Sequence, residues 1–206
     1  MKDTKKRILQ TALALFNSQG MAKITLRSIA NEMGISQGNL NYHFKKRNDI
    51  IEALYFQIVE SISNSIVTSN TAKTPLEAVF HISKTMLFTF YEYRFFLLDF
   101  VSIMRENSKI KAHYKQLMQQ RALEFTELID VLIENNLMRQ NVFPNEYENL
   151  FKRFQILSDF WMSSVVIEKG HITEALVHQY SEIIHQTIFP YLTLKGQEMY
   201  KSLSLV

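Results

Sequence analysis

Apolar positions recur every three to four residues along nearly the whole chain, which is the spacing of amphipathic α-helices. This pattern predicts helices over residues 2–19, 26–33, 37–43, 47–69, 75–92, 94–106, 109–136, 146–169 and 172–192. The chain holds only five Gly and three Pro in 206 residues, too few for the many tight turns of a strand-rich fold. No segment alternates convincingly between apolar and polar residues, so the expected fold class is all-α.

The first helices predict a small domain joined to a larger one. The helices at 26–33 and 37–43 are separated by a short turn containing Gly34, and Thr25 and Ser36 are suitable N-cap residues. A helix, a three-residue turn with Gly and a second helix is the spacing of a helix-turn-helix. We therefore expect a helix-turn-helix domain at 1–46 (the head) and a helical body at 47–206, linked by the helix at 47–69.

Charge is distributed unevenly between these two parts. Residues 1–50 carry nine Lys and Arg against three Asp and Glu, a net charge of +6, whereas the remainder carries 14 against 17, a net charge of −3. A basic head on a mildly acidic body indicates a polyanionic partner for the head. Chance clustering would give the same count, so charge alone does not decide.

The short helix at 37–43 carries side chains suited to reading DNA. The amides of Gln37, Asn39 and Asn41 can pair with adenine in the major groove, and Gly38 leaves room for a close backbone approach. The Tyr42 hydroxyl and the basic run that follows are suited to phosphate groups. The candidate DNA-binding residues are Thr25, Arg27, Ser36, Gln37, Gly38, Asn39, Asn41, Tyr42, His43, Lys45, Lys46 and Arg47.

The segment TLRSIANEMGISQGNLNYHFKKR, residues 25–47, resembles the DNA-binding signature of the TetR family of bacterial transcriptional regulators. The resemblance is specific over residues 5–55 and is one of architecture beyond them. It implies a homodimer whose two heads bind a near-palindromic operator in double-stranded DNA. It also implies repression, relieved when a small apolar or amphipathic effector binds the body. Lys46 stands where the family often has a small capping residue, and Asn41 where it often has an aromatic one.

The body contains a dense aromatic stretch, with eight Phe and Tyr between residues 80 and 100. Such a stretch is more often core than pocket, although apolar pockets between helices are common ligand sites. Asp99 and Asp159 interrupt apolar runs; each is exposed, paired with Arg94, Arg105 or Arg153, or available to a cationic ligand. The candidate ligand-binding residues are Phe88, Tyr91, Phe95, Asp99, Met104, Tyr114, Met118 and Phe125.

The last two predicted helices are long and amphipathic, so they either close the core of one protomer or form half of a four-helix dimer bundle. We favour the bundle, because a head that reads a palindrome needs a second copy. The candidate dimer interface comprises Phe154, Trp161, Val165, Tyr180, Ile184 and Ile188.

Three histidines, His171, His178 and His185, recur every seven residues and are expected on one helix face. At a rise of 1.5 Å per residue they lie about 10 Å apart, too far to share one metal ion. We therefore predict no metal site here. The three histidines are then expected to form either a partly exposed helix face or a pH-sensitive interface.

Other classes of protein are disfavoured. The chain has no Cys, no Gly-rich phosphate loop, no Gly-x-Ser-x-Gly and no His-Glu-x-x-His, so we expect neither an enzyme nor a bound cofactor. The most apolar window, 86–104, carries three charged residues, which argues against a membrane span and for a cytoplasmic protein. The alternative function is an architectural or protein-partnered DNA-binding module with no small-molecule effector.

Overall fold

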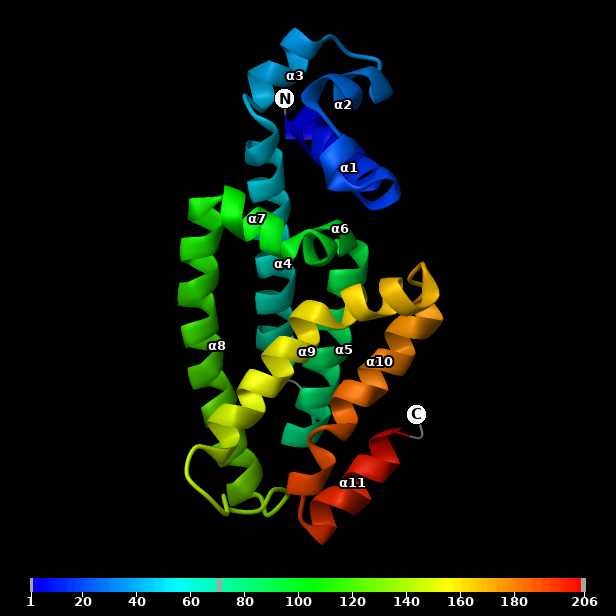
Figure 1. Cartoon of the computed structure of the whole chain (residues 1–206). Helices are drawn as coiled ribbons and strands as arrows, with labels where there is room; N and C mark the ends of the chain where they lie inside the picture. The colour runs from blue at the N-terminus through cyan, green and yellow to red at the C-terminus, as the bar shows by residue number, and fades with distance from the viewer. Residues whose placement is uncertain (1, 70–71, 205–206) are drawn as a thin grey trace.

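The computed structural model describes residues 2–69 and 72–204, which form eleven α-helices and two short 3-10 turns (Figure 1). The helices are α1 (Lys2–Gln19), α2 (Leu26–Glu32), α3 (Gln37–His43), α4 (Arg47–Ser69), α5 (Pro75–Glu92), α6 (Arg94–Leu98), α7 (Phe100–Glu106), α8 (Ser108–Glu134), α9 (Glu146–Lys169), α10 (Glu174–Gln186) and α11 (Leu194–Ser204). Within these ranges the extended pairing is a single isolated bridge between Met138 and Leu192. The predicted all-α class is confirmed.

The head, α1 to α3, lies at one end of the elongated molecule, and α4 runs from it into the body (Figure 1). The turn between α2 and α3 depends on Gly34, whose φ of 66° is a left-handed conformation that suits glycine. Its N–H donates to Asn31 O, and the next N–H, of Ile35, donates to Ala30 O, which closes α2 as a Schellman motif. This turn fixes the direction in which α3 leaves α2.

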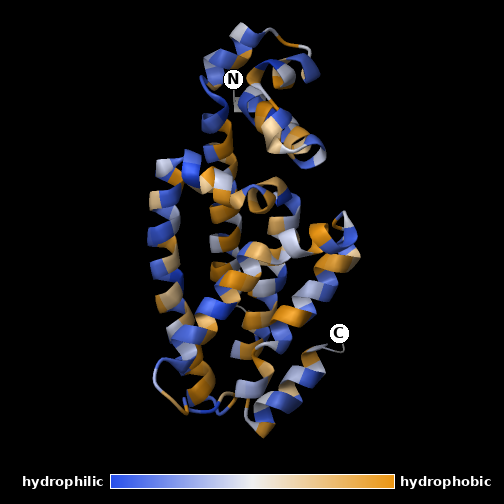
Figure 2. Ribbon diagram, in the orientation of Figure 1, coloured by the Kyte–Doolittle hydropathy of each residue, from blue (hydrophilic) through white to orange (hydrophobic). Residues whose placement is uncertain are grey.

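The apolar faces of the helices point inward, as the hydropathy colouring indicates (Figure 2). One buried cluster joins the head to the body through α1, α4 and α6, with Ile8, Phe16, Leu54 and Phe95 all nearly inaccessible to solvent. A second cluster lies at the far end of the body, where α5, α8 and α9 meet the C-terminal segments. The head therefore shares packed side chains with the body and is not connected by α4 alone.

Two predicted helices differ from the structure. The helix expected at 94–106 is broken at Asp99, giving the short α6 and α7. The helix expected at 172–192 ends at Gln186, and α11, which was not predicted, follows. On α11 a Cβ added to Gly196 would lie 2.0 Å from the Leu137 carbonyl oxygen, so α11 packs at a distance that only glycine permits.

One stretch of the described chain, Arg47–Thr68 in α4, is long and apolar enough to cross a membrane, with a mean hydropathy of 1.2 over its best window. In the fold its Ile50, Leu54 and Ile58 are buried in the cluster that joins head and body. Packing between helices accounts for the apolar character of this segment.

Candidate nucleic-acid interface

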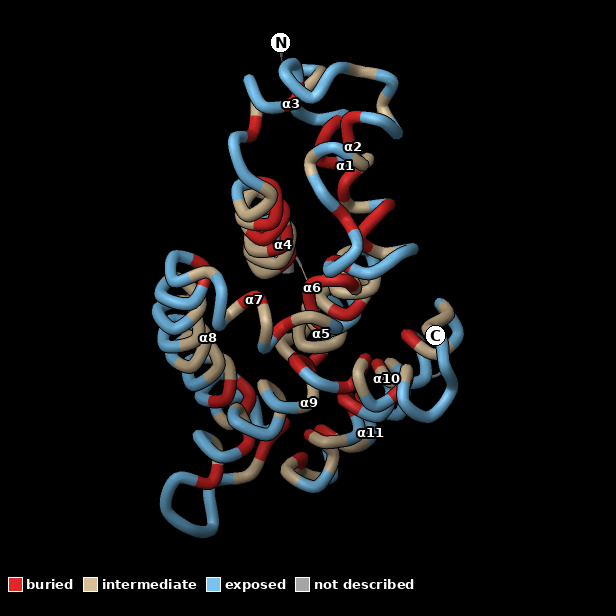
Figure 3. The backbone as a smooth tube through the Cα atoms, turned by 45° about the horizontal axis from the view of Figure 1, so that its top comes forward, coloured by how far each residue is buried: buried red, intermediate tan, exposed pale blue. Residues whose placement is uncertain are grey.

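Helix α3 forms an exposed tip of the molecule, anchored on one side only (Figure 3). Leu40 is fully buried and Phe44 nearly so, and together they hold α3 and the segment after it on the head core. The side chains of Gln37, Asn39 and Asn41 are exposed on the same short helix. The arrangement presents three amides outward on a fixed support.

The helix starts in the head are capped by hydroxyl groups. Thr25 and Ser28 form a reciprocal capping box: Ser28 N–H donates to Thr25 Oγ1 at 3.1 Å and Thr25 N–H donates to Ser28 Oγ at 2.8 Å. Ser36 Oγ accepts the N–H of Asn39 at 3.2 Å. Thr25 and Ser36 therefore stabilise the starts of α2 and α3, and Arg27 is exposed in the first turn of α2.

Tyr42 is 71% exposed, which is unusual for so large an apolar ring. His43 is half-buried and packs edge-on against it, with ring centroids 5.3 Å apart. At Gly38 an added Cβ would find a single neighbour, Ser36 Oγ at 3.9 Å, so the space beside this glycine is open. These residues leave the outer side of α3 unobstructed.

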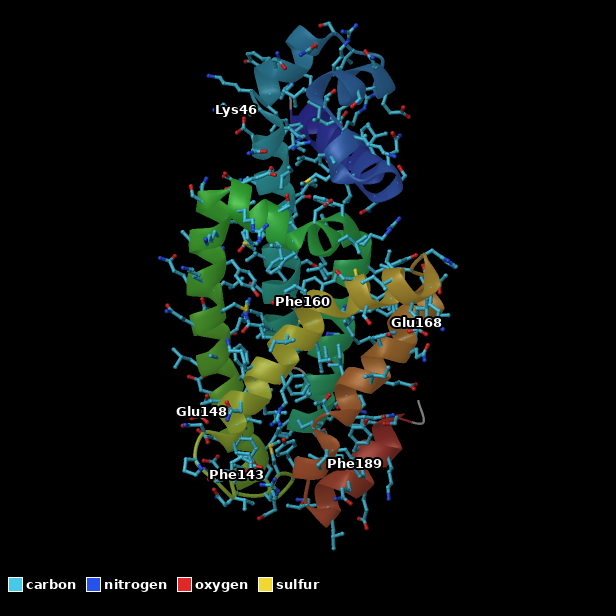
Figure 4. All side chains as sticks on the ribbon, viewed as in Figure 1. Lys46, Phe143, Glu148, Phe160, Glu168 and Phe189 are labelled. Atoms are coloured by element: carbon cyan, nitrogen blue, oxygen red, sulfur yellow. The ribbon has the colours of Figure 1, made fainter. Side chains whose placement is uncertain are left out.

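The basic run after α3 is divided between surface and interior. Lys45 and Lys46 are exposed, and Figure 4 labels Lys46 beside the start of α4. Asp49 Oδ2 accepts the Lys46 N–H at 2.9 Å, so a carboxylate replaces the small capping residue and α4 begins at Arg47. Arg47 turns inward: its Nη1 donates to the carbonyls of Met21 at 3.1 Å and Ile24 at 3.3 Å.

The inward position of Arg47 changes its interpretation. We predicted a phosphate contact, but in this structure the guanidinium group joins α4 to the loop before α2. Asp99, predicted as a ligand contact, lies at the same junction, near the Met21 backbone and Arg47. Burial raises the pKa of Asp99, while the Met21 backbone and the nearby Arg47 charge oppose that rise.

A second connection between head and body uses Asn17, which sequence reasoning missed. Its Nδ2 donates to Glu92 O at 2.7 Å, and its Oδ1 accepts the Phe95 N–H at 3.0 Å. One side chain at the end of α1 thus holds both the end of α5 and the start of α6. No local sequence signal distinguishes this asparagine from one exposed to solvent.

The body contains a cavity of about 490 Å³ between α4, α5, α8 and α9. Tyr114, Met118 and Phe125, from the predicted ligand-binding set, line it. Sequence analysis did not place Phe96, Phe100, Phe154, Gln155 or Ser158 in a pocket, yet these also line the cavity. Their helical spacing is typical of core residues, so the sequence pattern did not assign them to a pocket.

The other five predicted ligand residues do not line this cavity. Phe95 is buried against Phe16 with ring centroids 4.9 Å apart, and Phe88 packs edge-on against His178 at 5.0 Å. The Arg94 guanidinium lies 5.2 Å from the Tyr91 ring. Asp99 belongs to the head junction, and Met104 packs against the core cluster that joins head and body. These five predictions are corrected, because the five side chains lie on other sides of α5, α6 and α7 than Phe90, Phe96 and Phe100, which line the cavity.

The polar groups of the cavity are few. Asp159 is 9% exposed, and its Oδ2 accepts a 2.5 Å hydrogen bond from the Tyr114 hydroxyl, which itself accepts from Gln155 Nε2 at 3.0 Å. Burial raises the pKa of Asp159 to about 6, with the Tyr114 bond opposing that rise. His185 also lines the cavity, with Nε2 2.5 Å from Ser83 Oγ, and burial lowers its pKa to about 4.

The histidine stripe does not form one exposed face. His171 precedes α10, which begins at Glu174, and His178 is exposed. His185 is 8% exposed and stacks on Phe80 with ring centroids 4.2 Å apart. His171 and His178 are therefore exposed, whereas His185 is buried.

The predicted dimer residues are mostly interior. Trp161, Val165, Ile184 and Ile188 are at most 3% exposed, and Phe154 and Tyr180 are half-buried. The side chains that face inward cannot meet a partner, so the interface prediction selected the wrong side of each helix for these four. The exposed apolar residues of α9 and α10 are Ile156, Phe160, Ile167 and Ile183.

Two family models match the chain. Residues 8–54 match the family described as bacterial regulatory proteins, tetR family, and residues 57–200 match the TetR domain described as bacterial transcriptional repressor. Individual curated relatives share low sequence identity with this chain. The nucleoid occlusion factor SlmA of Haemophilus ducreyi is 25% identical over 138 residues, covering 64% of this chain and 67% of that protein. The regulator AcrR of Shigella flexneri is 31% identical over 74 residues, about a third of each chain.

Solved structures share the fold over nearly the full length. A TetR-family transcriptional regulator from Marinobacter aquaeolei superposes with a TM-score of 0.85 at 22% identity, covering 97% of this chain and 96% of that one. A putative regulator from Saccharomonospora viridis, solved with choline, gives 0.74 at 18% identity over 93% and 98%. With both family models matched along the sequence, the chain belongs to the TetR family of bacterial transcriptional regulators.

Proposed function

We propose that this regulator acts as a repressor: a homodimer places two copies of α3 in successive major grooves of a near-palindromic operator, and a small apolar or amphipathic effector releases it. The observation that carries the DNA contact is the exposed, amide-rich α3 held on buried Leu40 and Phe44. Amide side chains can pair with base edges, and the lysines after α3 suit phosphates. The two recognition helices would sit about one helical turn, ~34 Å, apart.

The exposed apolar residues of α9 and α10 support the homodimer. Ile156, Phe160 and Ile167 lie four and seven residues apart on α9, so at 100° per residue they share one face. Ile183 adds an exposed apolar side chain on α10. A four-helix dimer bundle requires exposed apolar residues on both helices that form it, and these four residues meet that requirement.

The body cavity supports an effector. Its volume of about 490 Å³ lies within the range of about 300–1,000 Å³ typical of small-molecule sites. The Saccharomonospora viridis regulator was solved in complex with choline. We therefore propose that ligand occupancy is linked to DNA affinity by a coupling free energy of about 1–3 kcal/mol.

Selection of bound duplexes from random DNA tests the DNA-binding proposal. We expect enrichment of two inverted half-sites, and Asn39→Ala should relax base preference within each half-site more than it lowers overall affinity. Enrichment of a single asymmetric site, or no enrichment, refutes the proposal. A uniform loss of affinity for all operator variants would show that Asn39 contributes no readout.

The similarity to nucleoid occlusion factors favours a second candidate, a DNA-binding module that works through a protein partner and has no effector. A thermal-shift screen separates the two. A ligand that binds the native state must raise the melting temperature, so a hit that also weakens DNA binding supports the effector. A screen with no hit among apolar and cationic compounds supports the partnered module.

A further inference from the structure

The cavity is lined mainly by apolar side chains, and one of its carboxyl groups, Asp159, is buried without an ion-pair partner among the described residues. Asp159 is nine-tenths buried and lines the cavity, and none of the ion pairs among the described residues includes it. Tyr114 donates to Oδ2, and no other described side chain donates to the carboxylate. Lys152 lies two turns away on α9, exposed to solvent, and acts on Asp159 only at a distance. A buried carboxylate with so little compensation is costly unless a ligand supplies the charge.

The remaining ionisable groups of the cavity do not supply a positive charge. Arg121 is paired with Glu124 at 2.5 Å, and its Nη2 also donates to Ser63 Oγ at 2.7 Å. His185 is held neutral by burial, with its pKa lowered to about 4. Glu127 also lines the cavity but is exposed to solvent, so Asp159 is the buried carboxylate of this lining that has no paired cation among the described residues.

The walls beside Asp159 are aromatic. Phe100 packs edge-on against Tyr114 with ring centroids 5.2 Å apart, and Phe96 stacks on Tyr55 at 5.4 Å. All four line the cavity. Aromatic faces attract organic cations, most strongly where water is excluded. A carboxylate next to aromatic rings favours cationic ligands over neutral and anionic ones.

The cavity continues away from this end. Its lining includes Ile58 and Ile62 on α4, Leu128 on α8 and Ile188 beyond α10, so it extends from α6 and α7 toward the far end of the body. This part is lined mainly by apolar side chains, and the cation beside it, Arg121, is already paired with Glu124. It suits a hydrocarbon chain.

We propose that the cavity binds a monovalent organic cation with an apolar tail, the cationic group lying against Asp159 and the adjacent aromatic rings. The effector role of such a cation rests on the proposed function, whereas the binding itself does not. The cation replaces the missing counter-charge and occupies the apolar channel at the same time. A carboxylate ligand of the same length would face Asp159 with a like charge.

Three probes of equal chain length test this: decyltrimethylammonium, 1-decanol and decanoate, titrated by calorimetry into the full-length protein at pH 7.5, below their aggregation concentrations. We expect the cation to bind at least tenfold more tightly than the alcohol, and decanoate more weakly than both. Asp159→Asn should weaken cation binding at least tenfold and leave 1-decanol within twofold. The exposed Asp130→Asn on α8 is the matched control and should leave all three constants unchanged.

Equal affinity of the wild type for cation and alcohol would overturn the proposal, as would tighter binding of decanoate or the absence of binding by all three probes. Parallel loss of cation and alcohol in Asp159→Asn would also overturn it, since the residue would then only maintain the cavity. DNA affinity measured with and without decyltrimethylammonium tests the effector role separately. Charge-selective binding with unchanged DNA affinity would leave the site standing and refute the proposed release of DNA.

Discussion

Replacement of Asp159 should stabilise the protein without ligand. Asparagine has nearly the same size, its amide oxygen can still accept the Tyr114 hydroxyl, and it carries no charge to desolvate. The pKa of Asp159 is raised from 3.8 to about 6 in the folded state, mainly by burial. An acid whose folded pKa is raised destabilises the fold once it ionises.

The size of the effect depends on pH. Below pH 3.8 both states are protonated and the penalty is absent; it grows as pH rises from 3.8 to about 6, and is constant above. For these pKa values the full penalty is about 3 kcal/mol at pH 8 and about 0.5 kcal/mol at pH 4. For a chain of this size, 3 kcal/mol corresponds to a rise in melting temperature of about 6–12 °C.

Thermal and urea unfolding of Asp159→Asn and wild type, at equal protein concentration, measure this difference at pH 4 and pH 8. Asp130→Asn, on the exposed side of α8, controls for the change in net charge. A gain in stability of the Asp159 variant that is equal at both pH values would refute the electrostatic explanation. A loss of stability at pH 8 would show that the carboxylate is well compensated in the folded protein, contrary to the contacts described above.

Four further substitutions test other parts of the molecule. Gly38→Ala should raise stability by about 0.5–1 kcal/mol, because the space beside it is open in the free protein, and should weaken DNA binding; unchanged affinity would mean that DNA does not approach there. Lys46→Ala should lower the salt dependence of operator binding by about one phosphate contact per protomer, measured as the slope of log K against log salt. Phe160→Glu should shift the protein toward monomer in sedimentation, while the matched exposed site Val142→Glu should not. Asn17→Ala removes both hydrogen bonds from α1 to α5 and α6, so it should reduce the effect of a bound ligand on DNA affinity; a full effect would exclude this route.

The head could be predicted because its determinants are local. The capping residues Thr25 and Ser36, the glycine at the turn and the buried positions Leu40 and Phe44 are all set by neighbours within a few residues in sequence. Because α3 has only seven residues and one side of it is buried, the opposite side is exposed to solvent. The exposure of its amides follows from the same periodicity that predicted the helix.

The faces of the body helices could not be assigned in this way. Helix α9 has apolar residues on two sides: Trp161 and Val165 face the interior, and Phe160 and Ile167 face outward. Periodicity identifies both sides but does not indicate which one the rest of the chain covers. The larger aromatic residue was assigned to the partner, whereas the fold stacks Trp161 on Tyr180 with ring centroids 5.1 Å apart.

Arg47 and Asp99 were misinterpreted for a related reason. Arg47 lies in a basic run and Asp99 lies in an apolar helix. Each of these contexts suggested that the residue binds a partner, DNA for Arg47 and a ligand for Asp99. Their contacts, however, are with residues at least 23 positions away on other elements. Such contacts depend on how head and body dock, and no pattern within a single helix encodes that docking.

The same docking connects the cavity to the head through α6 as well as through α4. Phe96, Leu97 and Phe100 line the cavity, and the N–H of the adjacent Phe95 donates to Asn17 at the end of α1. Because interiors are close-packed, a ligand that displaces α6 must also shift α1 or break that hydrogen bond. Either outcome changes the free energy of holding the head in one orientation. In the proposed homodimer, DNA affinity depends on that orientation because both recognition helices must fit one operator. The position of the cavity against α6 is therefore consistent with the proposed ligand control of DNA binding, and Asn17 is the residue at which that proposal can be tested.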